Sequence, residues 1–236
     1  DLANADCIVI EGSNMAECHP VGFRWVMEAK LRGATIIHVD PRFTRTSAVS
    51  DMYVPIRAGT DIVFLGALIT YVIQNERYFK EYVTSYTNAS AILREDYRDA
   101  EDLDGLFSGW QKDKAQYEGP TWRYEGTEHT EQEAHRVPES HAERVAHFAG
   151  PKVKAHATDP TLQHPRCVFQ ILKRHFQRYT PEMVEEVCGI SPEQFHKVAE
   201  ILCRNSGRER TSAFCYAVGW TQHSTGAQFI RSAGIL

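Results

Sequence analysis

The residues of this chain that could do chemistry lie in short polar loops, each of which directly follows an apolar stretch. The first loop, 12–19, comes after the apolar run 7–10 and precedes a helical pattern that starts at Pro20. Free backbone N–H groups at such a strand-to-helix turn favour an anion, and a pyrophosphate is one that this kind of turn binds. The candidate residues in this loop are Gly12, Ser13, Asn14 and Glu17.

Two further polar segments follow the second apolar run, 35–39. Asp40 closes this run, where nucleotide-binding βαβ units often place a carboxylate on a ribose or a base, although it could also only cap the turn before Pro41. Arg42, Arg45 and Arg57 lie close enough in sequence to meet phosphate charge with their planar donor groups. A second ring of N–H donors is predicted at the head of the apolar segment 61–75, at Gly59, Thr60 and Asp61.

A fourth polar segment follows 212–218, which has the composition of a buried strand. If that strand is parallel to the others, its polar end lies at the same sheet edge as the first loop. His223 could carry a proton near neutral pH, or it could bind and position a ligand. The candidates here are Gly219, Thr221, Gln222 and His223.

The elements that position these loops have the pattern of a βαβ unit. Between the two apolar runs, Val21, Trp25, Val26 and Ala29 recur at helical spacing, and Gly33 follows as a left-handed stop. Continuous apolar strands are typical of sheets covered on both faces. We therefore expect an α/β fold, a Rossmann-like three-layer sandwich with a mostly parallel sheet.

The first loop has one glycine where a Rossmann fingerprint has three, so a simple αβ domain with polar loops stays open at this point. The organisation predicted along the chain is a first part of a dinucleotide-binding-like domain (1–93), a polar insertion (94–160) and a segment that completes the domain (161–236). In the last segment, 168–176 has helical spacing, and Ser191 with Gln194 has the pattern of a capping box.

The insertion is rich in histidine, but the spacing there sets no pair of metal ligands, so we assign it no metal. These histidines include His129, His135, His141, His147 and His156.

Composition excludes several classes of protein. A formal net charge of -5 over 236 residues gives no general attraction to nucleic acid. The longest apolar stretch, 62–73, is shorter than the roughly 20 residues of a membrane span. The six cysteines form no CxxC pair, which argues against a cluster motif, a zinc motif or a disulfide framework. Cys18 lies at a helix start, where it is either a reactive thiolate or an unreactive thiol.

Because the chain starts at Asp1 and remains helical in pattern up to Leu236, we expect an internal piece of a longer polypeptide.

Five longer motifs make the chain similar to a known family. They are ECHPVGFRW at 17–25, DPRFTRT at 40–46, YTNAS at 86–90, TLQHPRC at 161–167 and GWTQHS at 219–224. Together they resemble the major subunit of respiratory formate dehydrogenases, which are molybdopterin oxidoreductases. The likeness spans nearly the whole chain, and the insertion is its weakest part.

This resemblance implies a catalytic subunit that holds molybdenum or tungsten between two molybdopterin guanine dinucleotides (bis-MGD) and carries one [4Fe-4S] cluster. It implies oxidation of formate to carbon dioxide and electron transfer to an iron–sulfur subunit and a membrane cytochrome subunit, in the periplasm. By similarity, nine residues line one guanine dinucleotide: Gly12, Ser13, Asn14, Glu17, Asp40, Arg42, Gly59, Thr60 and Asp61. Gly219, Thr221, Gln222 and His223 approach the pterin.

The ligands of the metal and of the cluster are expected outside this chain, so we predict no catalytic residue here and no activity of the segment alone. A non-catalytic scaffold of the same family and an NAD(P)-binding dehydrogenase domain are the alternatives.

Overall fold

A computed structural model describes residues 1–127 and 156–236. It divides the chain into two compact units, 1–79 with 176–236 and 80–175. The polar insertion expected at 94–160 lies within the second unit. His129, His135, His141 and His147 lie outside the described residues.

The first unit is built on a sheet of parallel strands in the order β3-β2-β1-β6. The strands are β1 (Cys7–Glu11), β2 (Thr35–Val39), β3 (Met52–Val54) and β6 (Ser212–Tyr216). In register, Ile8 of β1 lies opposite Ile36 of β2 and Ala213 of β6. Because all the strands run the same way, the loops that follow them leave the sheet at one edge.

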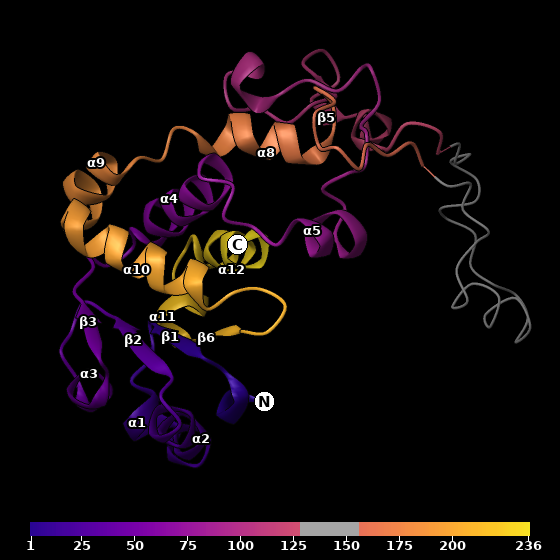
Figure 1. The fold of residues 1–236 in the computed structure, drawn as a ribbon. Helices are drawn as coiled ribbons and strands as arrows, with labels where there is room; N and C mark the ends of the chain where they lie inside the picture. Colours follow the sequence, from indigo (N-terminus) through magenta and orange to yellow (C-terminus); the bar gives the residue numbers. More distant parts are fainter. Residues whose placement is uncertain (128–155) are drawn as a thin grey trace, which may run out of the picture. The chain divides into compact units, whose positions relative to one another are not determined.

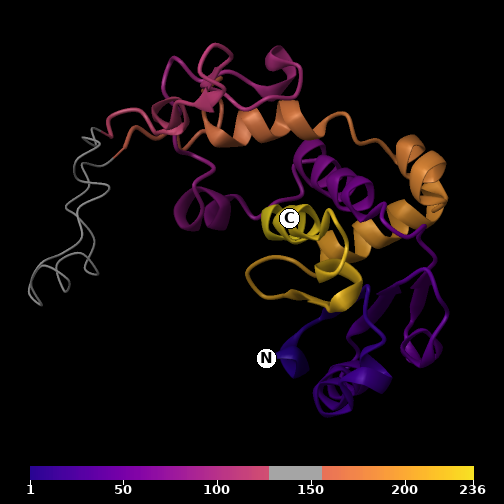
Figure 2. The ribbon, with the colours of Figure 1, turned by 180° about the vertical axis from the view of Figure 1, so that it is seen from behind.

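Helices cover both faces of this sheet, which confirms the predicted three-layer α/β sandwich. One face packs against α1 (Met15–Cys18) and α2 (Pro20–Leu31), and the other against α4 (Asp61–Gln74), α10 (Pro192–Arg204) and α12 (Gly226–Ile235) (Figure 1). In the view from behind, the indigo N-terminal helices and the yellow C-terminal helix again lie on opposite faces (Figure 2). Side chains alternate along β1, so that Ile8 and Ile10 face α2 while Cys7 and Val9 face α4.

The helix α2 forms as predicted, but its buried face differs from the prediction. Val21 is 75% exposed and Trp25 is 44% exposed, whereas Phe23, Val26 and Ala29 are buried. Helical spacing alone does not say which of two neighbouring stripes faces the sheet. Here the stripe through Phe23 does, and it packs on the side chains of β1 and β2.

The remaining elements of the first unit connect these layers. They are η1 (Leu2–Asn4), α3 (Arg45–Val49), α9 (Pro181–Met183), the π-helix η4 (Val184–Cys188) and α11 (Val218–Thr221). The predicted capping box at α10 is half formed. The Ser191 hydroxyl accepts from the Gln194 backbone N–H (3.2 Å), but the Gln194 side chain donates instead to the carbonyl of Tyr53 (2.9 Å), which ties α10 to the sheet.

The second unit contains short elements: α5 (Lys80–Tyr86), η2 (Ala100–Leu103), β4 (Trp110–Gln111), β5 (Gln116–Tyr117), η3 (Gly119–Trp122) and the predicted helix α8 (Val168–Phe176). β4 and β5 pair antiparallel, and isolated bridges link Ala91 to Thr158 and Ile92 to Cys167.

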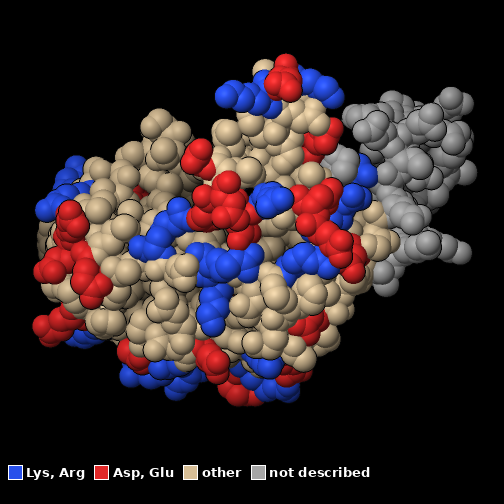
Figure 3. Space-filling view, turned by 90° about the horizontal axis from the view of Figure 1, so that it is seen from above, with Lys and Arg blue, Asp and Glu red and all other residues tan. Residues whose placement is uncertain are grey.

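Basic and acidic side chains are intermixed on the face of the molecule seen in Figure 3, so that face carries no large patch of one sign. Within the described residues, no helix is both long and apolar enough to cross a bilayer.

Candidate functional site

The first and the last of the candidate loops touch each other at the carboxyl edge of the sheet. The backbone N–H of Gly219 donates to the carbonyl of Gly12 (3.1 Å). A Cβ atom on Gly219 would lie only 2.4 Å from the Gly12 oxygen, so the approach of these two backbones requires glycine. Gly12 itself has a φ of +62°, a conformation that glycine adopts without strain.

The loop before α4 joins the same edge through Asp61. The Asp61 carboxylate accepts the indole N–H of Trp220 (3.0 Å), and both side chains are buried. Gly59 lies beside His223, since a Cβ on Gly59 would be 3.9 Å from the His223 Cδ2 atom. Thr60 donates its hydroxyl to the carbonyl of Arg57 (2.7 Å), which closes the turn. The structure therefore brings together the candidate loops around Gly12, Asp61 and Gly219.

Loop 12–19 is fixed to α3 on its other side. Asn14 accepts from the hydroxyl of Thr46 (3.0 Å), and that same hydroxyl oxygen accepts from the backbone N–H of Ala16 (3.0 Å). The Asn14 side chain also donates to Glu17 (2.5 Å), and the Glu17 carboxylate lies 3.4 Å from the guanidinium of Arg45. Glu17 is thus exposed at the rim of the edge, with its charge shared between an amide and an arginine.

A buried histidine that sequence reasoning missed lies beneath this loop. His38 of β2 is fully buried, with Nε2 3.1 Å from the carbonyl of Ser13 and Nδ1 2.8 Å from the hydroxyl of Ser47. Because a carbonyl only accepts, Nε2 carries the proton and Nδ1 accepts from Ser47. Burial lowers the pKa of His38, although Asp40 nearby opposes this shift. His38 is therefore a neutral ring whose hydrogen bond fixes the orientation of the Ser13 peptide.

Asp40 lies at the end of β2, as predicted. One of its carboxylate oxygens accepts from the backbone N–H of Arg42 (2.8 Å), which is the turn-capping contact that the sequence left open. Arg42, Phe43 and Arg45 line a hollow of about 470 Å³ together with Glu17. The Phe43 ring is 63% exposed, so this part of the edge offers cations, carboxylates and one aromatic face.

His223, Gln222 and Thr221 are all exposed after β6. The Nδ1 atom of His223 lies 2.5 Å from the carbonyl of Gly219, so Nδ1 carries the proton in the neutral ring. Nε2 is then an acceptor. This arrangement suits the positioning role considered for His223, because a ligand N–H or O–H can donate to Nε2.

The donors at this edge fit a diphosphate. Several backbone N–H groups there have no hydrogen-bond partner among the described residues: Ser13, Asn14, Met15, Gly59, Asp61 and Ile62. Unpaired N–H groups at the starts of helices, with Arg42 and Arg45 close by, are the donor set that an anionic diphosphate requires. The carboxylates of Asp40 and Glu17 can accept hydrogen bonds from the sugar hydroxyls and the guanine N–H groups of a dinucleotide.

Two residues considered in the sequence take other roles. The guanidinium of Arg57 donates to the carbonyls of Glu186 (2.5 Å) and Val187 (3.1 Å), so it caps η4. The Cys18 side chain is exposed and free, as the sequence allowed. No group of His, Cys, Asp and Glu within the described residues could hold a metal ion.

Glu11 is a second polar residue that sequence reasoning missed. It is the last residue of β1, it is fully buried, and neither of its carboxyl oxygens makes a hydrogen bond. Burial, followed by the charge of Asp61, raises the pKa of Glu11 well above its usual value. Its only sequence signal was an acidic residue that directly extends an apolar run.

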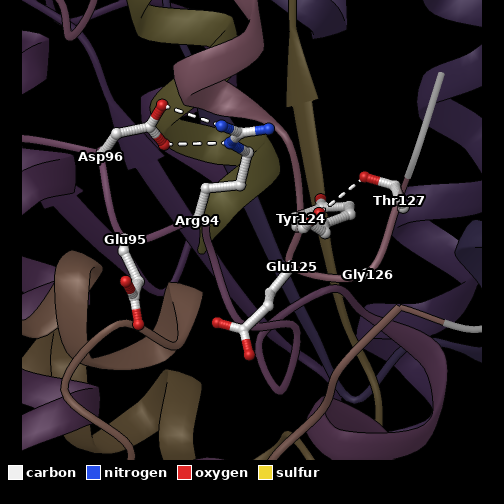
Figure 4. Close-up of a pocket in the computed structure, with 7 residues that line it drawn as sticks. All are labelled: Arg94, Glu95, Asp96, Tyr124, Glu125, Gly126 and Thr127. Carbon is white, nitrogen blue, oxygen red and sulfur yellow. Dashed lines mark hydrogen bonds and ion pairs between the residues drawn. The ribbon is translucent and has the colours of Figure 1, made fainter. Parts of the chain in front are cut away.

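The second unit has a pocket of its own, with a volume of about 500 Å³ (Figure 4). Two of its carboxylates are paired with arginines: Arg94 binds Asp96 through two hydrogen bonds of 3.0 and 3.1 Å, and Arg166 lies 2.7 Å from Glu125. Glu95, the third carboxylate, lies 3.9 Å from the same Arg166, and we assign the pocket no ligand.

Comparison with known proteins matches residues 1–236 to the family described as Molybdopterin oxidoreductase. The chain is 46% identical over 237 residues to the formate dehydrogenase-O major subunit of Escherichia coli (strain K12), and 42% identical over 235 residues to the formate dehydrogenase subunit alpha of Megalodesulfovibrio gigas. Each match covers 100% of this chain and 21% of the relative, so the chain spans about a fifth of the length of these proteins.

Among solved structures, acetylene hydratase from Pelobacter acetylenicus matches with a TM-score of 0.56 and 18% sequence identity. This match covers 98% of this chain and 21% of that one. At this identity, the likeness concerns the fold alone.

Proposed function

The chain belongs to the molybdopterin oxidoreductase family, and we propose that it is the guanine-dinucleotide-binding segment of a formate dehydrogenase catalytic subunit. The whole subunit would oxidise formate to carbon dioxide and pass the electrons to iron–sulfur partners. One observation carries the proposal: loops from separate parts of the chain meet at the carboxyl edge of the sheet with unpaired N–H groups and arginines. The identity to formate dehydrogenase subunits over the full chain supports the choice of substrate.

Different residues of the chain would bind different parts of the dinucleotide. The N–H groups of Ser13, Asn14 and Met15 would donate to the diphosphate, with those of Asp61 and Ile62 on the other side. The following residues would contact the rest of the dinucleotide: Glu17, Asp40 and Arg42 around the ribose, the guanine and the phosphates, and Gly59, Thr60, Gly219, Thr221, Gln222 and His223 toward the pterin.

The chemistry of formate oxidation would come from the cofactor, bis-MGD with molybdenum or tungsten, which accepts two electrons when bound. This chain would contribute alignment and exclusion of water. The metal ligand, the [4Fe-4S] ligands and the group that holds formate would come from other parts of the subunit. From the family resemblance we also propose that the intact enzyme lies in the periplasm, next to an iron–sulfur subunit and a membrane cytochrome subunit.

The guanine nucleotide content of the intact subunit tests this proposal. Acid hydrolysis of the purified subunit should release GMP, and Arg42→Glu should reduce the retained GMP by roughly tenfold or more, because it replaces a cation near the phosphates by an anion. Arg231→Glu is the matched control, since Arg231 is exposed on α12 and should leave the GMP content unchanged. Equal GMP in wild type and Arg42→Glu would contradict the assignment of this edge.

The same preparation separates the alternatives. A nicotinamide cofactor in place of GMP would favour an NAD(P)-binding dehydrogenase domain, which the single glycine of loop 12–19 argues against. GMP without formate-dependent reduction of a dye by the intact subunit would favour a non-catalytic scaffold of the family.

A further inference from the structure

Glu11 is an unusual residue for the interior of this sheet. Its side chain lies on the same face of β1 as Cys7 and Val9, opposite the apolar Val39 of β2, and it is 0% exposed. Neither of its oxygens is hydrogen-bonded. No lysine or arginine acts on it in the described part of the chain, so no cation there compensates a negative charge. Burial of an isolated carboxylate is strongly unfavourable, which favours the protonated form.

The groups packed against Glu11 come from several elements. α4 contributes Asp61, which is 6% exposed and acts on Glu11 by its charge. α11 contributes Trp220, whose indole N–H donates to Asp61 (3.0 Å). Tyr216, opposite on β6, stacks on Trp220 with ring centroids 4.8 Å apart. η4 contributes Cys188, a buried thiol that Glu11 and Asp61 both influence by charge.

These contacts decide which carboxyl group holds the proton. Two carboxyl groups that share a buried site do not both ionise near neutral pH. The indole N–H of Trp220 donates to Asp61 (3.0 Å), and burial together with the charge of Asp61 raises the pKa of Glu11 by more than Trp220 lowers it. The proton therefore resides on Glu11, and a neutral Glu11 can donate its O–H toward Asp61.

We propose that Glu11 is a positioning residue of the dinucleotide site: its neutral carboxyl group supports Asp61 and Trp220, and loss of its proton at alkaline pH releases the dinucleotide. The Asp61–Trp220 bond ties the turn before α4 to the turn after β6, so a charge on Glu11 would repel Asp61 and loosen both turns. Glu11 also lies one residue before loop 12–19, and its charge would repel the diphosphate there. This inference rests on the proposed function, because it assumes that a diphosphate binds at this edge.

The first test is the pH dependence of unfolding of the intact subunit, in wild type and Glu11→Gln. A raised pKa in the folded state means that the stabilisation is complete below the ordinary pKa of about 4.5 and is lost as pH rises through the raised value. Relative to Glu11→Gln, the folding equilibrium constant of the wild type should fall by up to about tenfold per pH unit over that window. Glu209→Gln, an exposed carboxylate of the same unit, should follow the wild type.

The second test is retention of guanine nucleotide after incubation at a series of pH values from neutral to alkaline, because the raised pKa of Glu11 moves the loss of its proton upward in pH. The wild type should lose GMP at alkaline pH, while Glu11→Gln should retain it. Glu11→Leu, which has similar volume and no charge, replaces Glu11→Gln if the latter does not fold.

The outcomes separate the two hypotheses. Absence of GMP from the wild type at neutral pH would refute the proposed function. Superimposable stability curves, or equal loss of GMP in wild type and Glu11→Gln at alkaline pH, would refute the role of Glu11.

Discussion

Substitution of Gly219 by alanine would test the convergence of the loops most directly. A Cβ atom at this position would lie 2.4 Å from the carbonyl oxygen of Gly12, 2.7 Å from its Cα and 2.8 Å from its carbonyl carbon. All three obstacles are backbone atoms, so no side-chain rotation relieves the clash. The two turns must separate, and the hydrogen bond from Gly219 to Gly12 (3.1 Å) must break.

The size of the effect follows from these contacts. Overpacking in a close-packed region costs about 1–3 kcal/mol, and a lost backbone hydrogen bond adds about 0.5–1.5 kcal/mol. We expect Gly219→Ala to lower the free energy of unfolding by roughly 2–4 kcal/mol. The melting temperature of the intact subunit should fall with it.

Thermal unfolding of the intact subunit, with GMP content measured on the same samples, checks this expectation. Gly207→Ala is the matched control, because a Cβ there meets no atom within 4 Å and should change stability by less than about 0.5 kcal/mol. Gly219→Ala should melt lower than the control and hold less GMP. If both variants melt together and hold equal GMP, the two turns do not depend on their close approach, and the geometry proposed for the site is wrong.

Two further substitutions test the groups beneath the loops. Trp220→Phe keeps an aromatic ring but removes the indole N–H, so the buried Asp61 loses its donor; we expect a loss of roughly 1–3 kcal/mol in urea unfolding, and an unchanged midpoint would contradict the bond. His38→Gln removes a group whose pKa burial lowers below 6.5. Since the unfolded chain takes up a proton there before the folded protein does, wild-type stability should fall as pH drops below about 6.5, and His38→Gln should lack this loss between about pH 5 and 7.

The main layers of the fold could be predicted because they follow from local patterns. The apolar runs that became β1 and β2 are continuous, which is typical of strands covered on both faces, and Pro20 and Gly33 bracket the helix between them. β3 was not predicted, since Met52–Val54 is too short to show a period. The strand predicted at 212–218 ends at Tyr216, because Val218 already begins the helical turn α11.

Contacts between distant parts of the chain were harder to predict. Most candidate residues follow a predicted strand, and the parallel order of the strands brings these loops to one edge, whereas Gly59, Thr60 and Asp61 are candidates because they precede a helix. The partner of each side chain is a different matter. Arg57 and Arg42 have the same local context, yet Arg57 binds the carbonyls at the end of η4, more than a hundred residues away in sequence. Only the packing of η4 on α4 decides this.

Glu11 and His38 are both polar residues within apolar strands. A strand covered on both faces buries every side chain, whatever its polarity, so the pattern that predicted β1 and β2 also required Glu11 and His38 to be buried. Each of them is therefore neutral when buried. The His38 ring carries one proton and accepts a hydrogen bond from the Ser47 hydroxyl, and the Glu11 carboxyl group keeps its proton. Both lie directly beneath loop 12–19. The pH range over which this edge keeps its shape is therefore bounded by His38 on the acid side and by Glu11 on the alkaline side.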